Sequence, residues 1–456
     1  MRWVSIQSLA RELGGECRQG EARVCSATLD SRQAGDGDLF IALSGESTDG
    51  HQYIDAAARA GASAAMVSHF VDSSLPQWRV TDPRRSLVEL ACRARAESRA
   101  TVAGVTGSNG KTTVKEMLAS ILAGLGPTRA TAGNQNNELG VPLTLCALDP
   151  EDRHAVVEMG CGRPGDIELL ASWARPSVGV INNVGPAHLG GFGSLEAIAR
   201  CKGELLAALP ANGQAIINAD DVFAHIWEQQ AAHCHIVRFS LADAPAEVSG
   251  RPGPDGDLEI RLPDTAPFRV QVPLPGSHNQ ANAMAAAAAA HAMGAGTDAI
   301  RSGLEAITPV AGRMVTRAGI NDATVIDDSY NANPASLAAA MRTLADGSAP
   351  LWVVLGDMAE LGPRTEAYHA DAGRIARQLG IARLYGLGAH SKRAVESFGG
   401  PIEGRAFDSR ADLVRALQAD LEPGVRVLVK GSRSARMDSV VDELVVGSGE
   451  EGPSCS

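Results

Sequence analysis

The alternation of apolar and polar stretches along the chain predicts a repeating pattern of strands and helices. In the middle of the chain, residues 154–160 (HAVVEMG), 177–185 (SVGVINNVG) and 214–221 (QAIINADD) are nearly continuous apolar segments that end in polar residues. Such segments are typical of strands in a parallel sheet that helices cover on both faces. Because ligands bind beyond the carboxyl ends of these strands, the polar residues there are candidates for a site.

The two ends of the chain show the same alternation on a smaller scale. Residues 1–82 contain apolar segments at 39–43 and 64–68 with a helical segment between them, which indicates a small α/β domain. Residues 313–456 alternate strand and helix as in a Rossmann-like α/β domain. The interpretation is an α/β protein of three domains, in which residues 83–312 form the central domain around a mostly parallel sheet.

One stretch interrupts this alternation. Residues 240–272 are rich in Pro, Gly and Asp, which predicts a surface hairpin or an irregular excursion. After it, Ser277 and Gln280 fit a capping box at the start of an alanine-rich helix. Asn279 and Asn282 fall in the first turn, either as ligands of a purine or phosphate or as plain capping residues.

A glycine loop between a strand and a helix is the strongest chemical signal. Residues 101–122 (TVAGVTGSNGKTTVKEMLASIL) read as a buried strand, a loop and an amphipathic helix. Glycines turn backbone N–H groups inward and the helix N-terminus attracts anions, so phosphates bind there. Lys111 reaches the outer phosphates of a nucleotide, and the Thr112 hydroxyl is placed for Mg²⁺. Val105 stands where the longer P-loop motif has its first glycine, so a simple glycine turn is the alternative. The predicted loop comprises Gly107, Ser108, Asn109, Gly110, Lys111, Thr112 and Thr113.

Lys202 falls on the apolar face of a later predicted helix. Its spacing from Ile198, Leu205 and Leu206 buries most of the side chain, although a lysine there can also extend to the surface. Burial disfavours the ammonium form, and a neutral amine can react with CO₂ to give a metal-binding carbamate. That face of the helix comprises Leu195, Ile198, Ala199, Lys202, Leu205, Leu206 and Leu209.

Other polar residues follow predicted strands. Glu158 and His188 lie just past strands of the central sheet, so both are candidate metal ligands rather than structural residues. Asp328 and Lys430 end strands of the third domain on the side where ligands bind. The loop that begins at Thr28 in the first domain is either an ordinary turn or a binding loop.

Composition and charge narrow the classes of function. The chain has 456 residues, 45% of them hydrophobic and 21% charged, and its net charge of -12 argues against a nucleic-acid surface. No window reaches the roughly eighteen apolar residues of a membrane span, and the N-terminus lacks a signal peptide, so we expect a cytoplasmic protein without membrane insertion. Its eight cysteines form no C-x-x-C pair, which favours reduced thiols over disulfides or zinc ligands.

Short motifs with a recognisable order are spread over nearly the whole chain. They are TGSNGKTT (106–113), NNELGVPLTL (136–145), VVEMG (156–160), NNVGPAHL (182–189), RCKGELL (200–206), GSHNQANA (276–283), GR (312–313) and DDSYNANP (327–334). Together these motifs resemble those of the Mur ligase family of peptidoglycan assembly. The resemblance implies an ATP-dependent amide ligase. In such an enzyme a substrate carboxylate attacks the γ-phosphate of ATP, and an amine then displaces phosphate from the acyl phosphate.

The resemblance also assigns roles to individual residues. It implies catalytic roles for Lys111, Lys202 and His188, and a carbamylated Lys202 that serves a second Mg²⁺. The implied metal ligands are Thr112, Glu158, His188 and Lys202, and the implied ATP contacts beyond the loop are Asn279, Arg313 and Asp328.

The choice of family member depends on fewer motifs. DDSYNANP, LGDMAELG (355–362) and VKGSRSARM (429–437) are most similar to the member that joins D-alanyl-D-alanine to UDP-N-acetylmuramoyl-tripeptide. Those two compounds are then the expected substrates, and we expect a monomer. The implied substrate contacts are Asp30, Ser31 and Arg32 for the uridine nucleotide, Asn136 and Asn137 for the peptide, and Tyr330, Asn331, Lys430 and Arg433 for the dipeptide.

Several alternatives remain open from the sequence. A sister ligase that adds the third amino acid, or a folate-tail glutamate ligase, would share the ATP site and differ in the acceptor. A kinase would transfer phosphate to a stable product. A P-loop regulatory protein would bind nucleotide without catalysis and would not need a buried Lys202.

Overall fold

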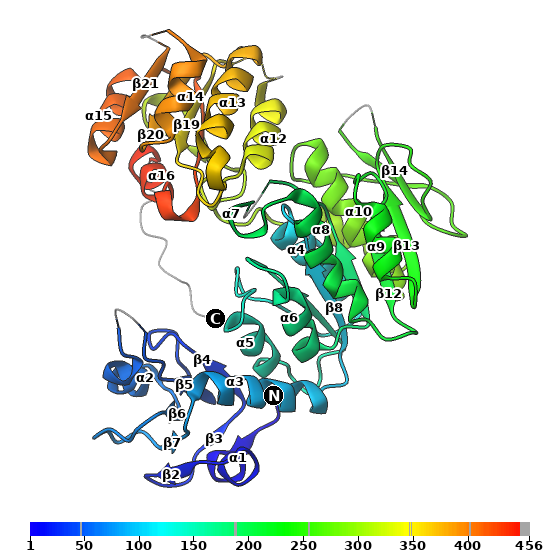
Figure 1. The fold of residues 1–456 in the computed structure, drawn as a ribbon, viewed down its shortest axis with the longest axis vertical. Coiled ribbons are helices and arrows are strands. Elements are labelled where there is room, and N and C mark those ends of the chain that lie inside the picture. Colours follow the sequence, from blue (N-terminus) through cyan, green and yellow to red (C-terminus); the bar gives the residue numbers. More distant parts are fainter. Residues whose placement is uncertain are drawn as a thin grey trace. The chain divides into compact units, whose positions relative to one another are not determined.

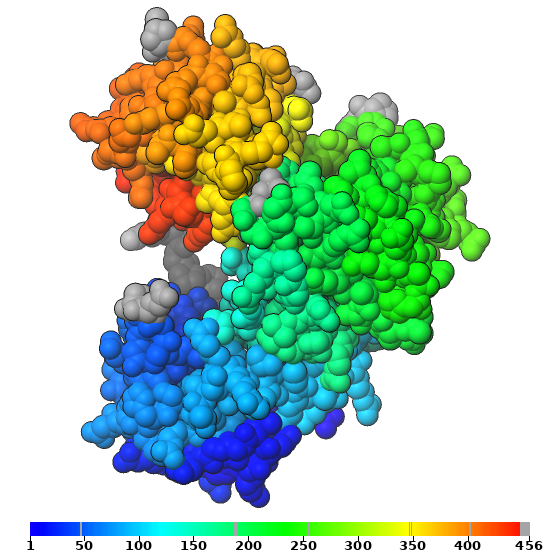
Figure 2. Space-filling view, viewed as in Figure 1, coloured from blue at the N-terminus to red at the C-terminus, as the bar shows by residue number. Residues whose placement is uncertain are grey.

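Two compact units make up the structure, a computed structural model shown as a ribbon in Figure 1. The structure describes residues 1–45, 48–186, 189–253, 256–345, 347, 349–400 and 403–446. The first unit contains Met1–Asn183, Ala199–Gln271 and Asn282–Ala306, and the second contains Val184–Ile198, Val272–Ala281 and Ile307–Ser456. The chain passes back and forth between the units, so neither is one contiguous segment. Figure 2 shows the atoms of the same face in space-filling form, coloured along the chain as in Figure 1.

The N-terminal part of the first unit is built on a five-stranded sheet. Its strands are β2 (Glu16–Arg18), β4 (Ser26–Thr28), β5 (Asp38–Ile41), β6 (Ala64–Val67) and β7 (Gln77–Arg79), beside a separate ribbon of β1 (Val4–Ser5) and β3 (Arg23–Val24). The helices are α1 (Ile6–Leu13), η1 (Gly50–Tyr53), α2 (Ile54–Ala60) and α3 (Pro83–Glu97). Pairing in the order β2-β7-β6-β5-β4 is parallel except at β2. The strand, helix and strand predicted over residues 39–68 are therefore confirmed.

The rest of the first unit is organised around a nine-stranded sheet. Its strands are β8 (Thr101–Thr106), β9 (Thr128–Ala130), β10 (His154–Glu158), β11 (Val178–Ile181), β12 (Gln214–Asn218), β13 (His235–Ser240), β14 (Val248–Pro252), β15 (Leu258–Arg261) and β16 (Phe268–Val270). The helices of this region are α4 (Lys111–Ala123), α5 (Gly140–Cys146), α6 (Asp166–Ala174), α9 (Ala224–Gln230) and α11 (Thr297–Glu305), together with most of α8 (Leu195–Ala207) and α10 (Ser277–Ala292). The first residues of α8, up to Ile198, and of α10, up to Ala281, belong to the second unit. The order is β16-β15-β14-β13-β12-β11-β8-β10-β9, parallel from β9 to β14, which confirms the predicted parallel sheet.

The Pro- and Gly-rich stretch at 240–272 extends this sheet rather than leaving it. The strands β14 and β15 form the expected antiparallel hairpin, and β16 adds a third antiparallel strand. Leu258, Ile260 and Phe268 are buried. An irregular surface excursion is therefore the wrong interpretation, because alternate apolar residues give these strands a buried face.

The capping box expected at Ser277 is also wrong. The first backbone acceptor of α10 is Gly276, whose carbonyl accepts from the N–H groups of Asn279 and Gln280. Gly276 has φ +96°, and a Cβ there would lie 2.6 Å from the Thr343 hydroxyl oxygen. The helix therefore begins one residue earlier than the sequence pattern indicates, at a position that only glycine fits.

Two paired glycines let α8 approach the central sheet closely. Gly104 of β8 and Gly179 of β11 are direct cross-strand partners. A Cβ on Gly104 would lie 2.8 Å from Cδ1 of Leu205, and one on Gly179 would lie 3.0 Å from Cδ2 of Leu206. The missing side chains make room for the leucines of α8, which fixes the position of Lys202 on the same helix.

The second unit is built on a six-stranded sheet in the order β17-β18-β22-β19-β20-β21. Its strands are β17 (Val315–Ala318), β18 (Thr324–Asp328), β19 (Leu351–Gly356), β20 (Arg383–Leu387), β21 (Gly404–Phe407) and β22 (Arg426–Lys430). Its helices are α7 (Leu189–Phe192), η2 (Ile320–Asp322), α12 (Pro334–Ala345), η3 (Gly362–Arg364), α13 (Thr365–Gln378), α14 (Ser391–Phe398), α15 (Arg410–Asp420), η4 (Arg433–Ala435) and α16 (Asp438–Leu444). All pairs except β17 with β18 are parallel.

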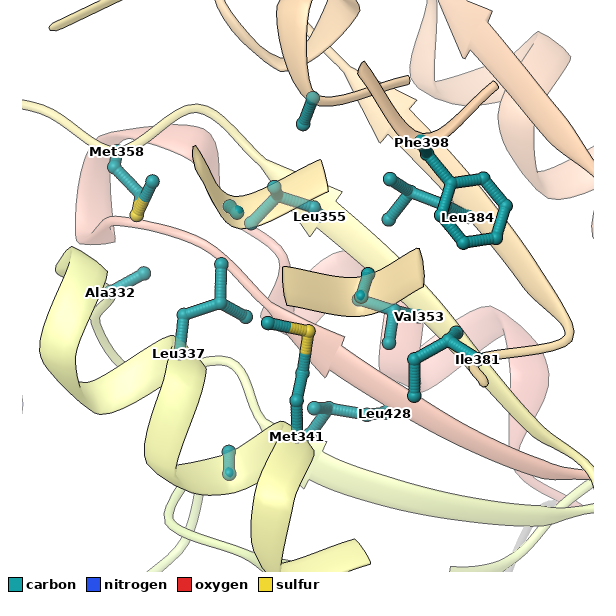
Figure 3. Close-up of a cluster of buried hydrophobic side chains, with 14 of the residues drawn as sticks. Ala332, Leu337, Met341, Val353, Leu355, Met358, Ile381, Leu384, Phe398 and Leu428 are labelled. Atoms are coloured by element: carbon teal, nitrogen blue, oxygen red, sulfur yellow. The ribbon is translucent and has the colours of Figure 1, made fainter. Parts of the chain in front are cut away.

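Helices cover both faces of this sheet, as the Rossmann-like prediction requires. Val353 faces α12, α13 and α14, in the cluster drawn in Figure 3, where Leu337 and Met341 point from α12 toward the strands. The next residue, Val354, packs on the opposite face against α15 and α16. The strand period of two thus buries successive residues in two separate cores.

Candidate functional site

The glycine loop has the backbone geometry of an anion cradle. Gly110 adopts φ +76° directly before α4. A Cβ at this position would lie 2.2 Å from Asn282 Oδ1 and 2.6 Å from Asn182 Nδ2. Only glycine therefore fits between the loop and these two amides, and the loop leads its N–H groups into the start of a 13-residue helix.

Two asparagines that follow β11 hold the loop in this shape. The N–H of Ser108 donates to the Asn183 carbonyl (2.9 Å), and the N–H of Asn109 donates to Asn183 Oδ1 (2.9 Å). Asn182 Nδ2 donates to the Asn109 carbonyl (2.9 Å) and to Asn282 Oδ1 (2.7 Å). Both asparagines lie at the predicted edge of the sheet, where they support the loop.

Lysine 111 lies across its own loop. Its Nζ donates to the Gly107 carbonyl at 2.9 Å, one turn back along the chain. This contact keeps the charge next to the backbone N–H groups that would receive a phosphate. The next two residues differ in burial, since Thr112 is buried and Thr113 is half-buried.

A buried carboxylate connects the loop to the neighbouring strand. Glu158, at the end of β10, is 1% exposed. Its Oε2 accepts from the Thr112 hydroxyl at 2.8 Å, and its Oε1 accepts from Asn136 Nδ2 at 2.7 Å. Its N–H donates to the Thr131 hydroxyl oxygen at 3.0 Å. Thr112, Glu158 and Asn136, predicted from three separate motifs, therefore meet at one point.

This donor set has the chemistry of a magnesium site. A carboxylate and a hydroxyl beside a phosphate cradle are the hard oxygen ligands that Mg²⁺ takes, usually together with phosphate oxygens and water. Within the part of the chain that the structure describes, no group of three or more His, Cys, Asp or Glu side chains could hold a metal ion by itself. A site completed by nucleotide oxygens does not need such a group. His188, the other predicted ligand, lies outside the described residues.

Lys202 is buried, as the helical spacing predicts. It is 3% exposed, so it does not extend to the surface, and its Nζ donates to Cys161 Sγ at 3.6 Å. Leu195, placed on the same apolar face by the spacing, is 37% exposed because it is the first residue of α8. The other members of that face are buried, namely Ile198, Ala199, Leu205, Leu206 and Leu209.

Two thiols lie beside this lysine, and no sequence motif marks either of them as functional. The Cys201 thiol donates to the Arg163 carbonyl at 3.4 Å. Interaction with Cys201 lowers the pKa of Cys161, and interaction with Cys161 raises the pKa of Cys201. Cys201 precedes Lys202 on α8, and Cys161 follows β10 by three residues. Only the fold brings these two segments together.

A second buried lysine was also missed. Lys115, four residues after Lys111, is 0% exposed. Its Nζ donates to the carbonyls of Thr131 (2.6 Å) and Gly133 (3.0 Å) and lies 2.9 Å from Glu116 Oε1. This lysine ties α4 to the turn that leads to Asn136. No apolar periodicity marks it, because its partners are backbone atoms distant in sequence.

In the second unit, an arginine and an aromatic ring form a second candidate region. The Arg313 guanidinium lies 4.5 Å from the centroid of the Tyr330 ring, and that of Arg433 lies 5.8 Å from it. The Tyr330 N–H donates to the Gly312 carbonyl at 3.1 Å. Stacking of this kind orients a guanidinium for an anion.

Asp328 and Lys430 form one ion pair rather than two separate contacts. Lys430 Nζ donates to Asp328 Oδ2 at 2.5 Å and to the Asn331 carbonyl at 2.9 Å, and both side chains are buried. Asn279 Nδ2 donates to the Pro275 carbonyl at 2.8 Å. Any ligand contact by these polar groups adds to, or replaces, the bonds that they already make.

The predicted uridine and peptide loops have ordinary local geometry. Asp30 accepts from Arg32 Nε (2.9 Å) and Nη2 (2.7 Å), and this pairing lowers the pKa of Asp30 to about 2. Ser31 between them is buried. Asn137 Oδ1 accepts from the N–H groups of Leu139 and Gly140, as a turn residue does. Arg32 and Asn137 are exposed to solvent.

Among the described residues, no helix is long and apolar enough to cross a membrane.

The fold and the site define a class: a three-domain α/β nucleotide-binding protein with a glycine loop beside a buried carboxylate. Models of the Mur ligase family catalytic domain, the Mur ligase middle domain and the Mur ligase glutamate ligase domain match residues 24–93, 105–290 and 312–433.

Full-length relatives agree with these domains. The chain is 40% identical to the UDP-N-acetylmuramoyl-tripeptide–D-alanyl-D-alanine ligase of Escherichia coli K12, covering 97% of this chain and 98% of that one. A crystal structure of MurF from Acinetobacter baumannii superposes with a TM-score of 0.83 at 31% identity, covering 97% of this chain and 99% of that one. MurF ligase from Thermotoga maritima, solved in complex with ADP, gives 0.76 at 28% identity over 92% and 96%. The chain belongs to the Mur ligase family.

Proposed function

We propose that this protein joins D-alanyl-D-alanine to UDP-N-acetylmuramoyl-tripeptide in the cytoplasm, with ATP as the energy source, during synthesis of the peptidoglycan precursor. The geometric observation that carries the proposal is the buried Glu158, bonded to Thr112 of the phosphate loop and to Asn136 of the predicted peptide loop. Relatives named for this reaction cover 97% and 91% of the chain, which favours this reaction over those of ligases with other acceptors.

The reaction needs a carboxylate to be activated and then attacked. The terminal carboxylate of the tripeptide attacks the γ-phosphate, ADP leaves, and the amine of D-alanyl-D-alanine displaces phosphate from the acyl phosphate. In this scheme Lys111 neutralises the charge on the transferring phosphoryl group, and the loop N–H groups from Gly107 to Thr113 hold the phosphates. Asn279, Arg313 and Asp328 supply further ATP contacts.

Thr112 and Glu158 are the described residues that would hold Mg²⁺, with His188 as a further ligand. The ion, when bound, neutralises phosphate charge during phosphoryl transfer. Asn136 fixes one oxygen of Glu158 and thereby leaves the other directed toward Thr112. Lys202, as a carbamate, would present two oxygens to a second Mg²⁺, whereas an ammonium would repel it.

The sequence motifs that resemble those of the family suggest which residues contact the substrates. Asp30, Ser31 and Arg32 bind the uridine nucleotide, and Asn136 and Asn137 bind the peptide. In the second unit, Tyr330 and Arg433 are the better candidates for the dipeptide, because Lys430 is already bonded to Asp328 and to the Asn331 carbonyl. We propose that the protein acts as a monomer.

An acceptor-exchange assay tests the function. The protein is incubated with ATP, Mg²⁺ and the UDP-linked tripeptide, and D-alanyl-D-alanine is compared with glutamate and with single D-alanine. We expect ADP, phosphate and a new amide, identified by mass spectrometry, only when the acceptor is D-alanyl-D-alanine. A stable phosphorylated product would instead indicate a kinase, and nucleotide binding without turnover would indicate a regulatory protein.

The proposed carbamate on Lys202 can be detected directly by NMR. Protein equilibrated with ¹³C-labelled bicarbonate should show a carbamate carbon signal in NMR that is absent from Lys202→Arg. Lys202→Ala should lose most activity, and a small carboxylate such as formate should restore part of it. A wild-type rate in Lys202→Arg, or no signal in the native protein, would refute this role for Lys202.

A further inference from the structure

The loop that joins β10 to α6, residues 160–165, is held by side chains of α8. Lys202 Nζ donates to Cys161 Sγ at 3.6 Å, and the Cys201 thiol donates to the Arg163 carbonyl at 3.4 Å. Two consecutive residues of the helix thus contact the loop at two points. A carboxylate further along the same helix contacts the end of the loop.

This carboxylate, Glu204, caps the N-terminus of α6 from another helix. Its Oε1 accepts from the Gly165 N–H at 2.9 Å, and its Oε2 accepts from the Glu168 N–H at 3.1 Å. These are the two N–H groups that a capping box satisfies with side chains of the helix itself. Gly165 is the N-cap residue of α6 and has no side chain for this purpose. Because the first N–H groups of a helix lack partners within it, α8 supplies the missing acceptors.

Burial does little to fix the loop. Gly162, Arg163, Pro164 and Gly165 are all exposed to solvent. Asp166 Oδ2 accepts from the N–H groups of Gly162 (2.8 Å) and Arg163 (2.9 Å), and these bonds shape the turn without attaching it to another element. The attachment of the loop to its surroundings therefore depends on polar contacts, of which Glu204 makes two.

Helix α8 is itself fixed by contacts that do not involve the loop. Trp227 Nε1 of α9 donates to the Ala199 carbonyl at 3.0 Å, and Gln230 Nε2 donates to the Arg200 carbonyl at 3.0 Å. Gly203 lets the two helices approach closely, since a Cβ there would lie 1.6 Å from Gln230 Oε1. The position of α8 is thus set by the core, and the loop follows it.

The same loop contacts the segment that contains the predicted peptide residues. The Gly160 N–H donates to the Asn136 carbonyl at 2.8 Å, and Arg163 Nη2 donates to Glu138 Oε1 at 3.1 Å. A Cβ on Gly160 would lie 2.8 Å from Asn136 Oδ1, so the two segments approach closely. The loop therefore connects α8 to Asn136, whose side chain also bonds Glu158.

From these contacts we propose that Glu204 is a positioning residue for the UDP-linked tripeptide. By capping α6 it holds the 160–165 loop, and the loop holds the segment of Asn136 and Glu138. The inference rests on the proposed function, because that function assigns Asn136 and Asn137 to the peptide. Glu204 acts through the loop and does not itself touch a substrate.

Hydrogen exchange over residues 160–168, measured by mass spectrometry, tests the capping. Glu204→Ala removes both acceptor oxygens, whereas Glu204→Gln keeps one. The matched control is Glu168→Gln, which removes an exposed carboxylate from the first turn of α6 and leaves both backbone N–H bonds in place. This control accounts for the loss of negative charge at a helix N-terminus. Exchange should accelerate in Glu204→Ala and stay at the wild-type rate in Glu168→Gln. Unchanged exchange in Glu204→Ala would overturn the proposal.

Ligase kinetics test the effect on the substrate. KM for the UDP-linked tripeptide should rise about tenfold or more in Glu204→Ala, since misplacing a positioning group by about 1 Å can cost on the order of a hundredfold. Glu204→Gln should fall between Glu204→Ala and the wild type. KM for ATP should stay at the wild-type value, because the bonds of Lys111 and Thr112 do not involve the loop.

The kinetic outcomes separate positioning from a role in stability alone. An equal rise of KM for ATP and for the tripeptide, or a lower urea midpoint with both KM values unchanged, would overturn the positioning role. A wild type without ligase activity would contradict the proposed function and with it this role of Glu204. The exchange experiment would still show in that case whether Glu204 caps α6.

Discussion

Lys115 provides a sharp test of how the phosphate-loop helix is anchored. Its ammonium group is fully buried and bonded to the carbonyls of Thr131 and Gly133, and it pairs with Glu116. Lys115→Met keeps the length of the side chain and removes the charge and its donors. The change therefore isolates the polar contacts that join α4 to the turn after β9.

The expected cost can be worked from these contacts. A buried acceptor left without a hydrogen-bond partner costs about 1–3 kcal/mol. In this variant, two carbonyls each lose the hydrogen bond from the lysine. The variant no longer desolvates an ammonium group, which offsets part of that loss. Removing one partner of a buried ion pair typically lowers stability by about 3–5 kcal/mol. We expect a decrease of about 3 kcal/mol in the free energy of unfolding.

Urea-induced unfolding of the wild type and the variant measures this change, with hydrogen exchange of residues 128–137 as a local readout. Glu116→Gln is the matched control, because Glu116 is 36% exposed and its pairing should contribute less than about 1 kcal/mol. Exchange should accelerate in that turn in Lys115→Met. An unchanged unfolding midpoint together with unchanged exchange would refute the anchoring role of Lys115.

Three further predictions follow from the same structure. Lys111→Ala should fold normally and lose on the order of a hundredfold or more in kcat, and a near-normal kcat would contradict the P-loop assignment. Gly110→Ala should abolish nucleotide binding, measured by calorimetry, because its Cβ would lie 2.2 Å from Asn282 Oδ1. Burial raises the pKa of Tyr385 to about 12 from 10.0, so its stabilising effect is complete below pH 10.0 and is lost as pH rises through about 12. Tyr385→Phe should remove this alkaline component from a plot of urea midpoint against pH.

The sequence predicted those parts of the fold that local patterns determine. Apolar segments ending in polar residues gave the strands β10, β11 and β12, and helical spacing gave the burial of Lys202. The glycine loop was found from its residue types, because an anion cradle needs glycines at left-handed positions such as Gly110. The domain boundaries near 82 and 312 stay predictions.

Long-range contacts could not be predicted in the same way. The bond between Asn182 and Asn282 joins residues one hundred positions apart, and the pair of Asp328 with Lys430 joins residues 102 apart. Helical or strand periodicity contains no information about such pairs. The sequence therefore named Lys430 as a dipeptide contact without showing that its charge is already neutralised.

The position of Lys202 shows how absent side chains help to build the site. The spacing on α8 decides only that Lys202 faces the sheet, and how near it comes depends on what the sheet presents there. Gly104 and Gly179, opposite each other on β8 and β11, present no side chain, and the leucines next to Lys202 on α8 occupy that space. Because β8 runs directly into the glycine loop, the strand that admits the helix also carries the loop. Lysine and loop are thereby positioned by the same strand, although about ninety residues of sequence separate them.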